Sequence, residues 1–263
     1  MRKYKLGIVL SGGGARGIAH LGVLDALHKH GIEPEVVSGS SIGAIVGCFY
    51  AAGVEPSFIL DEIKKEKLTR FFSWSFPLSG FLDLDYMQEW FAKHISEDNF
   101  RALKKPFFIS VTNLNSGKNE IINEGPLFDF VIASSTIPLI FKPRIINNNT
   151  YVDGGILNNM PAIAIRDFCD TIIGVNINHS GPLEKIHGMK EIVERSLRLA
   201  IESNIKENMR VCDIMIQPEE MKGISTFEFR RADEIYQIGF DATEEMMPEI
   251  RNKLGQSHSE ISI

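Results

Sequence analysis

The stretch Gly39-Ser40-Ser41-Ile42-Gly43 places a serine at the centre of a G-x-S-x-G pentapeptide. A short apolar strand precedes it and a helix of small residues follows, which is the context in which this motif forms a nucleophile elbow. The outer glycines, Gly39 and Gly43, suit a turn so sharp that side chains there would collide with the adjacent strand and helix. The plain alternative is a helix N-cap in which Ser40 or Ser41 satisfies backbone N–H groups. The pentapeptide alone leaves both interpretations open.

A nucleophilic serine needs a base, which is usually a histidine oriented by a carboxylate. In α/β-hydrolases the histidine comes last in the chain, which leaves His179, His187 and His258. His258 lies in a polar tail, whereas His179 follows an expected strand and stays open as the base. The four earlier histidines are better explained as surface or satisfied core residues.

Asp153 offers a second solution to the same problem. An expected strand delivers it into Gly154-Gly155, a backbone that can turn sharply and approach another loop. A carboxylate bonded to the serine hydroxyl can take its proton without histidine. An ordinary turn aspartate before glycines is the plainer interpretation, so Asp153 alone decides nothing.

A glycine loop, Gly12-Gly13-Gly14-Ala15-Arg16-Gly17, lies between an expected strand and a helix. Gly12, Gly14 and Gly17 match the G-x-G-x-x-G dinucleotide fingerprint, so a nucleotide-binding Rossmann-type protein is one hypothesis. That site wants an acidic residue at the end of the second strand, but Glu33 and Glu35 lie before or at its start. The other hypothesis is that backbone N–H groups of the loop converge on an oxyanion.

Composition narrows the classes of function. The net charge of −6 and pI near 5.7 argue against a nucleic-acid binder, which would carry a basic face. Three scattered cysteines form neither a disulfide framework nor a CxxC metal pair. The first apolar run is too short for a signal peptide, and no run reaches the roughly 20 residues of a membrane span. We therefore expect a cytoplasmic protein.

Strand and helix signals alternate along the chain, which predicts a mainly parallel sheet flanked by helices. After the elbow, helices are expected at 54–70, 85–93, 126–135, 161–168, 189–211 and 229–253, and strands at 106–113, 119–123, 143–147, 150–152, 171–177 and 213–216. No repeat or linker marks a boundary, so residues 1–255 are expected to form a single domain. Residues 256–263 are expected to be a disordered tail.

Four segments, taken in order, resemble the patatin-like phospholipase family: the glycine loop, the elbow, Ala133-Ser134-Ser135-Thr136-Ile137-Pro138 and Asp153-Gly154-Gly155. In length and compactness the chain is similar to bacterial members related to the neuropathy target esterase branch. The resemblance covers residues 6 to about 162. It implies a three-layer α/β/α fold and a lipid acyl hydrolase, a phospholipase A or lysophospholipase. The implied reaction passes through an acyl-enzyme and needs no metal or organic cofactor.

The same resemblance assigns roles to individual residues. It implies a catalytic dyad of Ser41 and Asp153. It also implies an oxyanion hole built from Gly12, Gly13 and Gly14, with supporting motif residues at Arg16, Gly17, Gly39, Gly43, Gly154 and Gly155. Arg16 either holds the loop or attracts a lipid phosphate, and we favour the first role.

The aromatic stretch between Phe71 and Leu82 fits neither a helix nor a strand period. It suits a lid or a patch that contacts a membrane surface transiently, or a cap packed over the core, which we favour slightly. The expected partner is a lipid or other acyl ester. The sequence leaves open a homodimer, and also a catalytically silent interaction protein with the patatin fold.

Overall fold

The computed structural model describes residues 3–65, 84–178, 188–226 and 228–255. Within these residues an eight-stranded sheet has the order β5-β6-β3-β2-β1-β7-β8, and β4 pairs with β3. The strands are β1 (Tyr4–Leu10), β2 (Val36–Ser40), β3 (Phe107–Asn113), β4 (Lys118–Ile122), β5 (Arg144–Ile146), β6 (Asn149–Asp153), β7 (Cys169–Val175) and β8 (Ile214–Ile216). The five strands from β3 to β8 in this order run parallel, whereas β4, β5 and β6 pair antiparallel.

Helices cover both faces of this sheet. The α-helices are α1 (Ala19–Lys29), α2 (Ile42–Ala52), α3 (Pro56–Lys65), α5 (Tyr86–Ala92), α6 (Leu127–Ser134), α7 (Gly155–Asn158), α8 (Ile163–Arg166), α9 (Gly188–Arg210) and α10 (Ala232–Lys253). Short 3₁₀ turns are η1 (Gly14–Ile18), η2 (Phe100–Ala102), η3 (Glu219–Gly223) and η4 (Phe229–Arg231). In the described ranges no helix is long and apolar enough to cross a bilayer.

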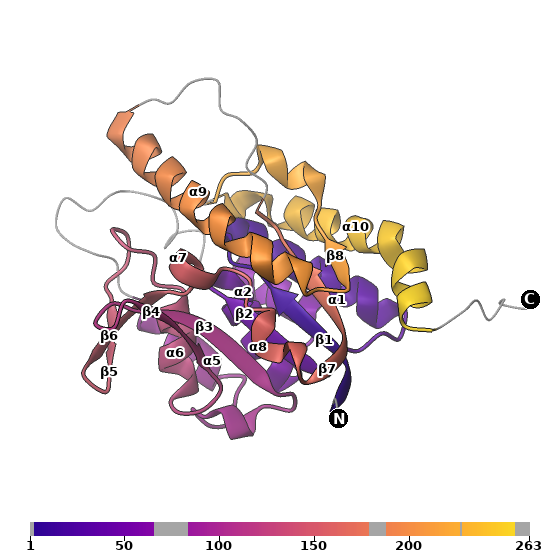
Figure 1. The fold of residues 1–263 in the computed structure, drawn as a ribbon, viewed down its shortest axis with the longest axis horizontal. Coiled ribbons are helices and arrows are strands. Elements are labelled where there is room, and N and C mark those ends of the chain that lie inside the picture. Colours follow the sequence, from indigo (N-terminus) through magenta and orange to yellow (C-terminus); the bar gives the residue numbers. More distant parts are fainter. Residues whose placement is uncertain (1–2, 66–83, 179–187, 227, 256–263) are drawn as a thin grey trace, which may run out of the picture.

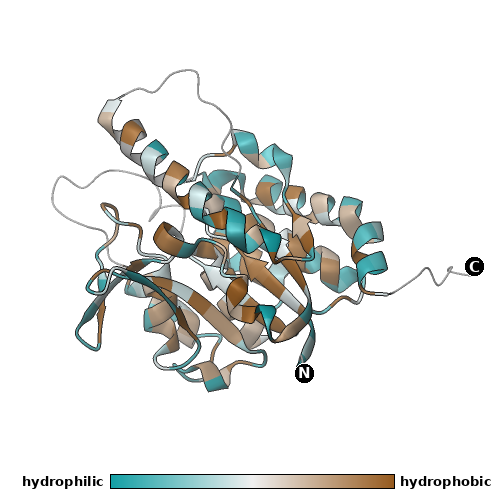
Figure 2. Cartoon of the chain, viewed as in Figure 1, coloured by the Kyte–Doolittle hydropathy of each residue, from teal (hydrophilic) through white to brown (hydrophobic). Residues whose placement is uncertain are grey.

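Two hydrophobic cores lie on opposite faces of the sheet. The larger core contains apolar side chains of α1, α2, α3, α5, α6 and α10. The smaller core contains apolar side chains of α8 and α9 and those that β1 and β7 direct to the opposite face of the sheet. Strands buried on both faces are apolar throughout, as β1 is from Leu6 to Leu10. Figure 2 shows the central strands mostly in brown, the colour of hydrophobic residues. The three-layer α/β/α architecture with a mostly parallel sheet is therefore confirmed (Figure 1).

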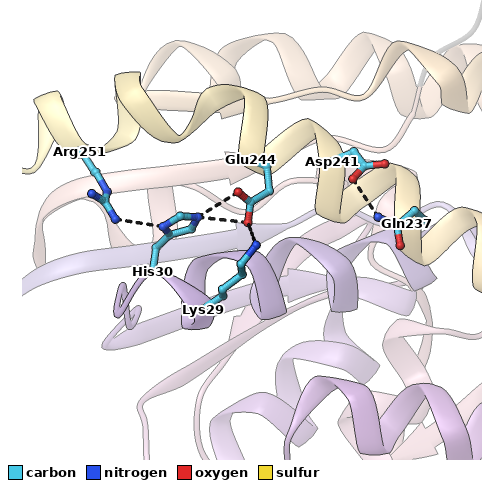
Figure 3. A network of polar contacts seen from close by, with 6 residues as sticks. All are labelled: Lys29, His30, Gln237, Asp241, Glu244 and Arg251. Carbon is cyan, nitrogen blue, oxygen red and sulfur yellow. Dashed lines mark hydrogen bonds and ion pairs between the residues drawn. The ribbon is translucent and has the colours of Figure 1, made fainter. Parts of the chain in front are cut away.

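Helices α1 and α10 lie side by side in the larger layer (Figure 1). A Cβ atom on Gly22 would overlap the Tyr236 carbonyl, so the two backbones approach closely at this crossing. At the end of α1, His30 lies between Glu244 and Arg251 of α10, and Figure 3 shows its two ring nitrogens facing one partner each. Both contacts tie α10 to the helix that follows the glycine loop.

Several elements differ from the sequence-based expectations. The glycine loop continues into the 3₁₀ turn η1 rather than directly into an α-helix, and the short helix α7 directly after Asp153 was not expected. Helix α8 has four residues where 161–168 was expected. The segment from Phe71 to Leu82 and the tail 256–263 lie outside the described residues, so their interpretations stay predictions.

Candidate active site

Ser41 occupies a strained turn between β2 and α2. Its backbone has φ 55° and ψ −127°, a conformation that non-glycine residues rarely adopt and that costs about 1–3 kcal/mol. A Cβ atom on Gly39 would lie 2.5 Å from the carbonyl oxygen of Gly43, and one on Gly43 would overlap the carbonyl oxygen of Leu10. Both flanking positions therefore require glycine, as the sharp-turn argument predicts.

The turn directs the Ser41 hydroxyl at Asp153, which ends β6. Ser41 Oγ donates a hydrogen bond of 2.6 Å to Asp153 Oδ2, and the N–H of Gly155 donates one of 2.7 Å to Oδ1. Burial raises the pKa of Asp153 from 3.8 to about 6, although both hydrogen bonds lower it. The result is a carboxylate that touches a serine hydroxyl and holds its proton more readily than an exposed aspartate does.

The end of α6 positions both members of this pair. The Ser134 hydroxyl accepts the N–H of Ser41 at 2.9 Å and donates to the Ser110 carbonyl at 2.7 Å. The carbonyl of Thr136 accepts the N–H of Asp153 at 2.9 Å. These residues belong to the 133–138 block of the resemblance, for which the sequence suggested no physical role.

The glycine loop lies beside the elbow, because a Cβ atom on Gly12 would come 2.9 Å from Ser41 Cβ. Gly12 donates its N–H to the Asn159 carbonyl at 3.1 Å, whereas the N–H groups of Gly13 and Gly14 donate to no other residue in the described part of the chain. The N–H groups of Gly13 and Gly14 therefore suit an oxyanion better than that of Gly12 does, and the oxyanion role of both residues stays a prediction. The same role for Gly12 stays a prediction.

Arg16 is buried and turns back onto the loop. Its Nε donates to the Gly13 carbonyl at 3.3 Å and Nη2 donates to Asn178 Oδ1 at 3.2 Å, while Asn178 Nδ2 donates to the Gly12 carbonyl at 2.5 Å. A Cβ atom on Gly17 would overlap Ile42, so η1 packs directly on α2. These contacts support the loop-holding role of Arg16 over the phosphate-attracting one.

The same loop is poorly arranged for a dinucleotide. Thr226 crosses it, accepting the N–H of Ala15 at 2.7 Å and filling the space over Gly14 that a pyrophosphate would need. Glu35 sits before β2 and accepts the N–H of Lys5, at the wrong end of that strand for a ribose. No observation among the described residues favours nucleotide binding.

The histidines bear on the choice of base. His179, His187 and His258 lie outside the described residues, so a histidine triad stays an untested alternative. His20 is fully buried and contacts the Ser11 carbonyl through Nε2 at 2.8 Å, and burial lowers its pKa to about 4. In the described ranges, no three His, Cys, Asp or Glu side chains gather as a metal site requires.

Residues 8–165 match a family model described as patatin-like phospholipase, which spans more than half of the chain. The chain belongs to this family. The patatin-like match ends before β7, which continues the sheet beside β1, and before α10, which packs against η1.

Similar proteins include fungal lysophospholipases. The lysophospholipase NTE1 of Mycosarcoma maydis is 29% identical over 92% of this chain, and that of Coccidioides immitis is 27% identical over 95%. The chain spans only 15% and 18% of the length of these two relatives. The bacterial part of the sequence-based expectation stays a prediction.

A solved structure, VipD from Legionella pneumophila, superposes with a TM-score of 0.54 at 17% identity. The match covers 95% of this chain and 67% of that one. At this identity the likeness supports the shared fold alone.

Proposed function

We propose that this patatin-like protein is a serine hydrolase that cleaves carboxylic ester bonds of lipids, with Ser41 as nucleophile and Asp153 as base. The observation that carries the proposal is the 2.6 Å hydrogen bond from Ser41 Oγ to Asp153 Oδ2 at a strained nucleophile elbow. Family membership and the lysophospholipase names of the relatives support a lipid ester as substrate.

The reaction proceeds in two acyl transfers. Asp153 takes the hydroxyl proton as Ser41 Oγ attacks the ester carbonyl, and it returns that proton to the departing alcohol or lysolipid. A water molecule then gives a proton to Asp153 and attacks the acyl-enzyme, which releases a fatty acid and restores the Ser41 hydroxyl. A raised carboxyl pKa suits both steps, because a base works best when its pKa lies near the working pH.

The tetrahedral intermediates carry a negative oxygen, and we assign its stabilisation to the N–H groups of Gly13 and Gly14. One such donor typically contributes about 3–4 kcal/mol to the transition state. Gly12 acts with them only if its N–H leaves the Asn159 carbonyl, to which it is bonded at 3.1 Å.

Within this class a monoacyl phospholipid is the proposed substrate, supported by the names of the relatives. The test is a lipid panel on purified protein, with diacyl and monoacyl phospholipids and neutral acyl esters assayed beside the Ser41→Ala variant. Hydrolysis of monoacyl phospholipid that Ser41→Ala abolishes is the expected result. Preference for another ester contradicts the substrate assignment but leaves the chemistry intact.

The dyad itself is tested by a second set of variants. Ser41→Ala should lose both turnover and labelling by a fluorophosphonate, Asp153→Asn should lose turnover, and His179→Ala should keep it. Loss of activity in His179→Ala with retention in Asp153→Asn points instead to a histidine triad. Absence of turnover and of Ser41 labelling in the wild-type protein leaves the catalytically silent interaction protein as the better description.

A further inference from the structure

Helix α9 places the side chain of Asn204 against the turn that follows the dyad aspartate. Asn204 Nδ2 donates to the carbonyls of Gly155 at 2.9 Å and Ile156 at 3.1 Å, and Oδ1 accepts the N–H of Asn159 at 2.9 Å. One amide therefore holds both ends of α7. The Gly155 at its start is the residue whose N–H bonds Asp153 Oδ1.

Asn159, which also bonds Asn204, lies between the glycine loop and the turn that follows Asp153. Its carbonyl accepts the N–H of Gly12 at 3.1 Å and its Nδ2 donates to the Gly12 carbonyl at 3.4 Å. Its Oδ1 occupies the place where a Cβ atom on Gly12 would stand, and it would lie 2.6 Å from a Cβ atom on Gly155. Asn159 is almost fully buried and packs against both loops, so its position sets the separation of Gly12 from Gly155.

We propose that Asn204 is a positioning residue for the hydrolytic reaction. Through Gly155 and Asn159 it fixes the distance between the Ser41–Asp153 pair and the N–H groups of the glycine loop. The inference rests on the proposed function. The side-chain bonds of Asn204 go to Gly155, Ile156 and Asn159 and not to Ser41 or Asp153. Its loss should therefore misalign the reacting groups and lower kcat, with little effect on KM.

The location of Asn204 makes this inference independent of the family match. Residue 204 lies beyond the segment 8–165 that matches the family model. The periodicity of the helix that contains it predicts a buried face but does not identify the residues that Asn204 bonds. The bonds that it makes join residues 45 to 49 positions apart in the chain.

Asn208, one turn further along α9, provides a matched control. Its Oδ1 accepts the N–H of Ile163 at 3.1 Å and its Nδ2 donates to Asn158 Oδ1 at 3.2 Å. It has the same residue type, the same helix and a similar number of hydrogen bonds as Asn204. Its partners are α8 and a side chain of α7, so its loss should lower stability without moving Gly155 or Gly12.

The experiment compares Asn204→Ala, Asn204→Asp and Asn208→Ala with the wild-type protein on a water-soluble p-nitrophenyl ester. Fluorophosphonate titration counts the active sites, so that kcat is expressed per competent molecule, and thermal unfolding gives Tm. Asn204→Asp has the size of the native side chain, but its carboxylate faces the carbonyls of Gly155 and Ile156. It tests the donated bonds without leaving a cavity, and it remains informative if the alanine variant does not fold.

We expect both Asn204 variants to lower kcat per titrated site by about 10- to 100-fold with KM within about twofold, because a displacement of about 1 Å can cost about 100-fold in rate. Asn208→Ala should keep kcat within about twofold of the wild-type value, even if its Tm falls as much as the Tm of the Asn204 variants. Unchanged kcat in the Asn204 variants, or an equal fall in Asn208→Ala, overturns the proposal while the wild-type activity stands. A wild-type protein without Ser41-dependent turnover overturns the proposed function, and the inference falls with it.

Discussion

Replacing Asp153 by asparagine is expected to abolish turnover and yet to stabilise the folded protein at neutral pH. Burial raises the pKa of this carboxyl from 3.8 to about 6 in the folded protein, although the hydrogen bonds from Ser41 and Gly155 lower it. The folded state therefore holds the proton more tightly than the unfolded chain does. The contribution of Asp153 to the free energy of unfolding is therefore largest below pH 3.8, and it is lost as the pH rises to about 6.

The magnitude follows from the two pKa values. At about 1.4 kcal/mol for each pKa unit, the ionised carboxylate costs the folded protein about 3 kcal/mol above pH 6. Asparagine keeps an acceptor for the Gly155 N–H and carries no charge to desolvate. After subtraction of about 1 kcal/mol for a poorer contact with the Ser41 hydroxyl, about 2 kcal/mol remains. In a chain of this size that corresponds to about 4–8 °C in Tm.

The assay is thermal unfolding of wild-type protein and Asp153→Asn at pH 8 and again near pH 4, with esterase activity measured on the same samples. The variant should unfold at a higher temperature at pH 8, and the gap should close towards pH 4, where most of the native carboxyl is protonated. A variant that is less stable at pH 8, or a gap that does not depend on pH, refutes the reasoning that burial of the charge is the dominant cost.

Two further outcomes are expected. Because Asp153 must be ionised to accept the Ser41 proton, kcat/KM should fall tenfold per pH unit below about 6 and level off above it, and an acidic limb near 4 would contradict the raised pKa. Gly43→Ala should lose about 3 kcal/mol of unfolding free energy in denaturant titration, because its Cβ atom would overlap a main-chain oxygen that cannot move away. Gly223→Ala, with open space around its Cβ position, should stay within about 0.5 kcal/mol, and equal losses at the two positions would show that steric overlap is not the cause.

The sequence predicted the parallel part of the fold well, because strands buried on both faces leave continuous apolar runs and their helices carry a clear period. It also indicated Ser41 and Asp153, which the structure brings together, because the glycines beside each residue are local signals of sharp turns and the resemblance joined the two motifs. The short helix α7 escaped, because two consecutive glycines are typical of a turn and four residues show no periodicity.

The residues that hold the site together could not be found in this way. Ser134, Asn159, Asn178 and Asn204 act through hydrogen bonds to residues between 24 and 166 positions away. Partners so far apart in the chain leave no local pattern in the sequence. The hydrogen bond from Gly12 to Asn159 also joins residues far apart in the sequence. Because it occupies the N–H of Gly12, the proposed oxyanion donors are now Gly13 and Gly14. Contacts over such separations become visible only when the topology is known.

The bond between Thr226 and the glycine loop has a consequence for how the protein is made. The carbonyl that holds Ala15 belongs to Thr226, which is synthesised more than 200 residues after the loop. At about 5–20 residues per second, at least about 10 s separate the two. A nascent chain therefore carries Ser41 and Asp153 well before Thr226 can hold its glycine loop, and the proposed hydrolysis should begin only after Thr226 has been synthesised.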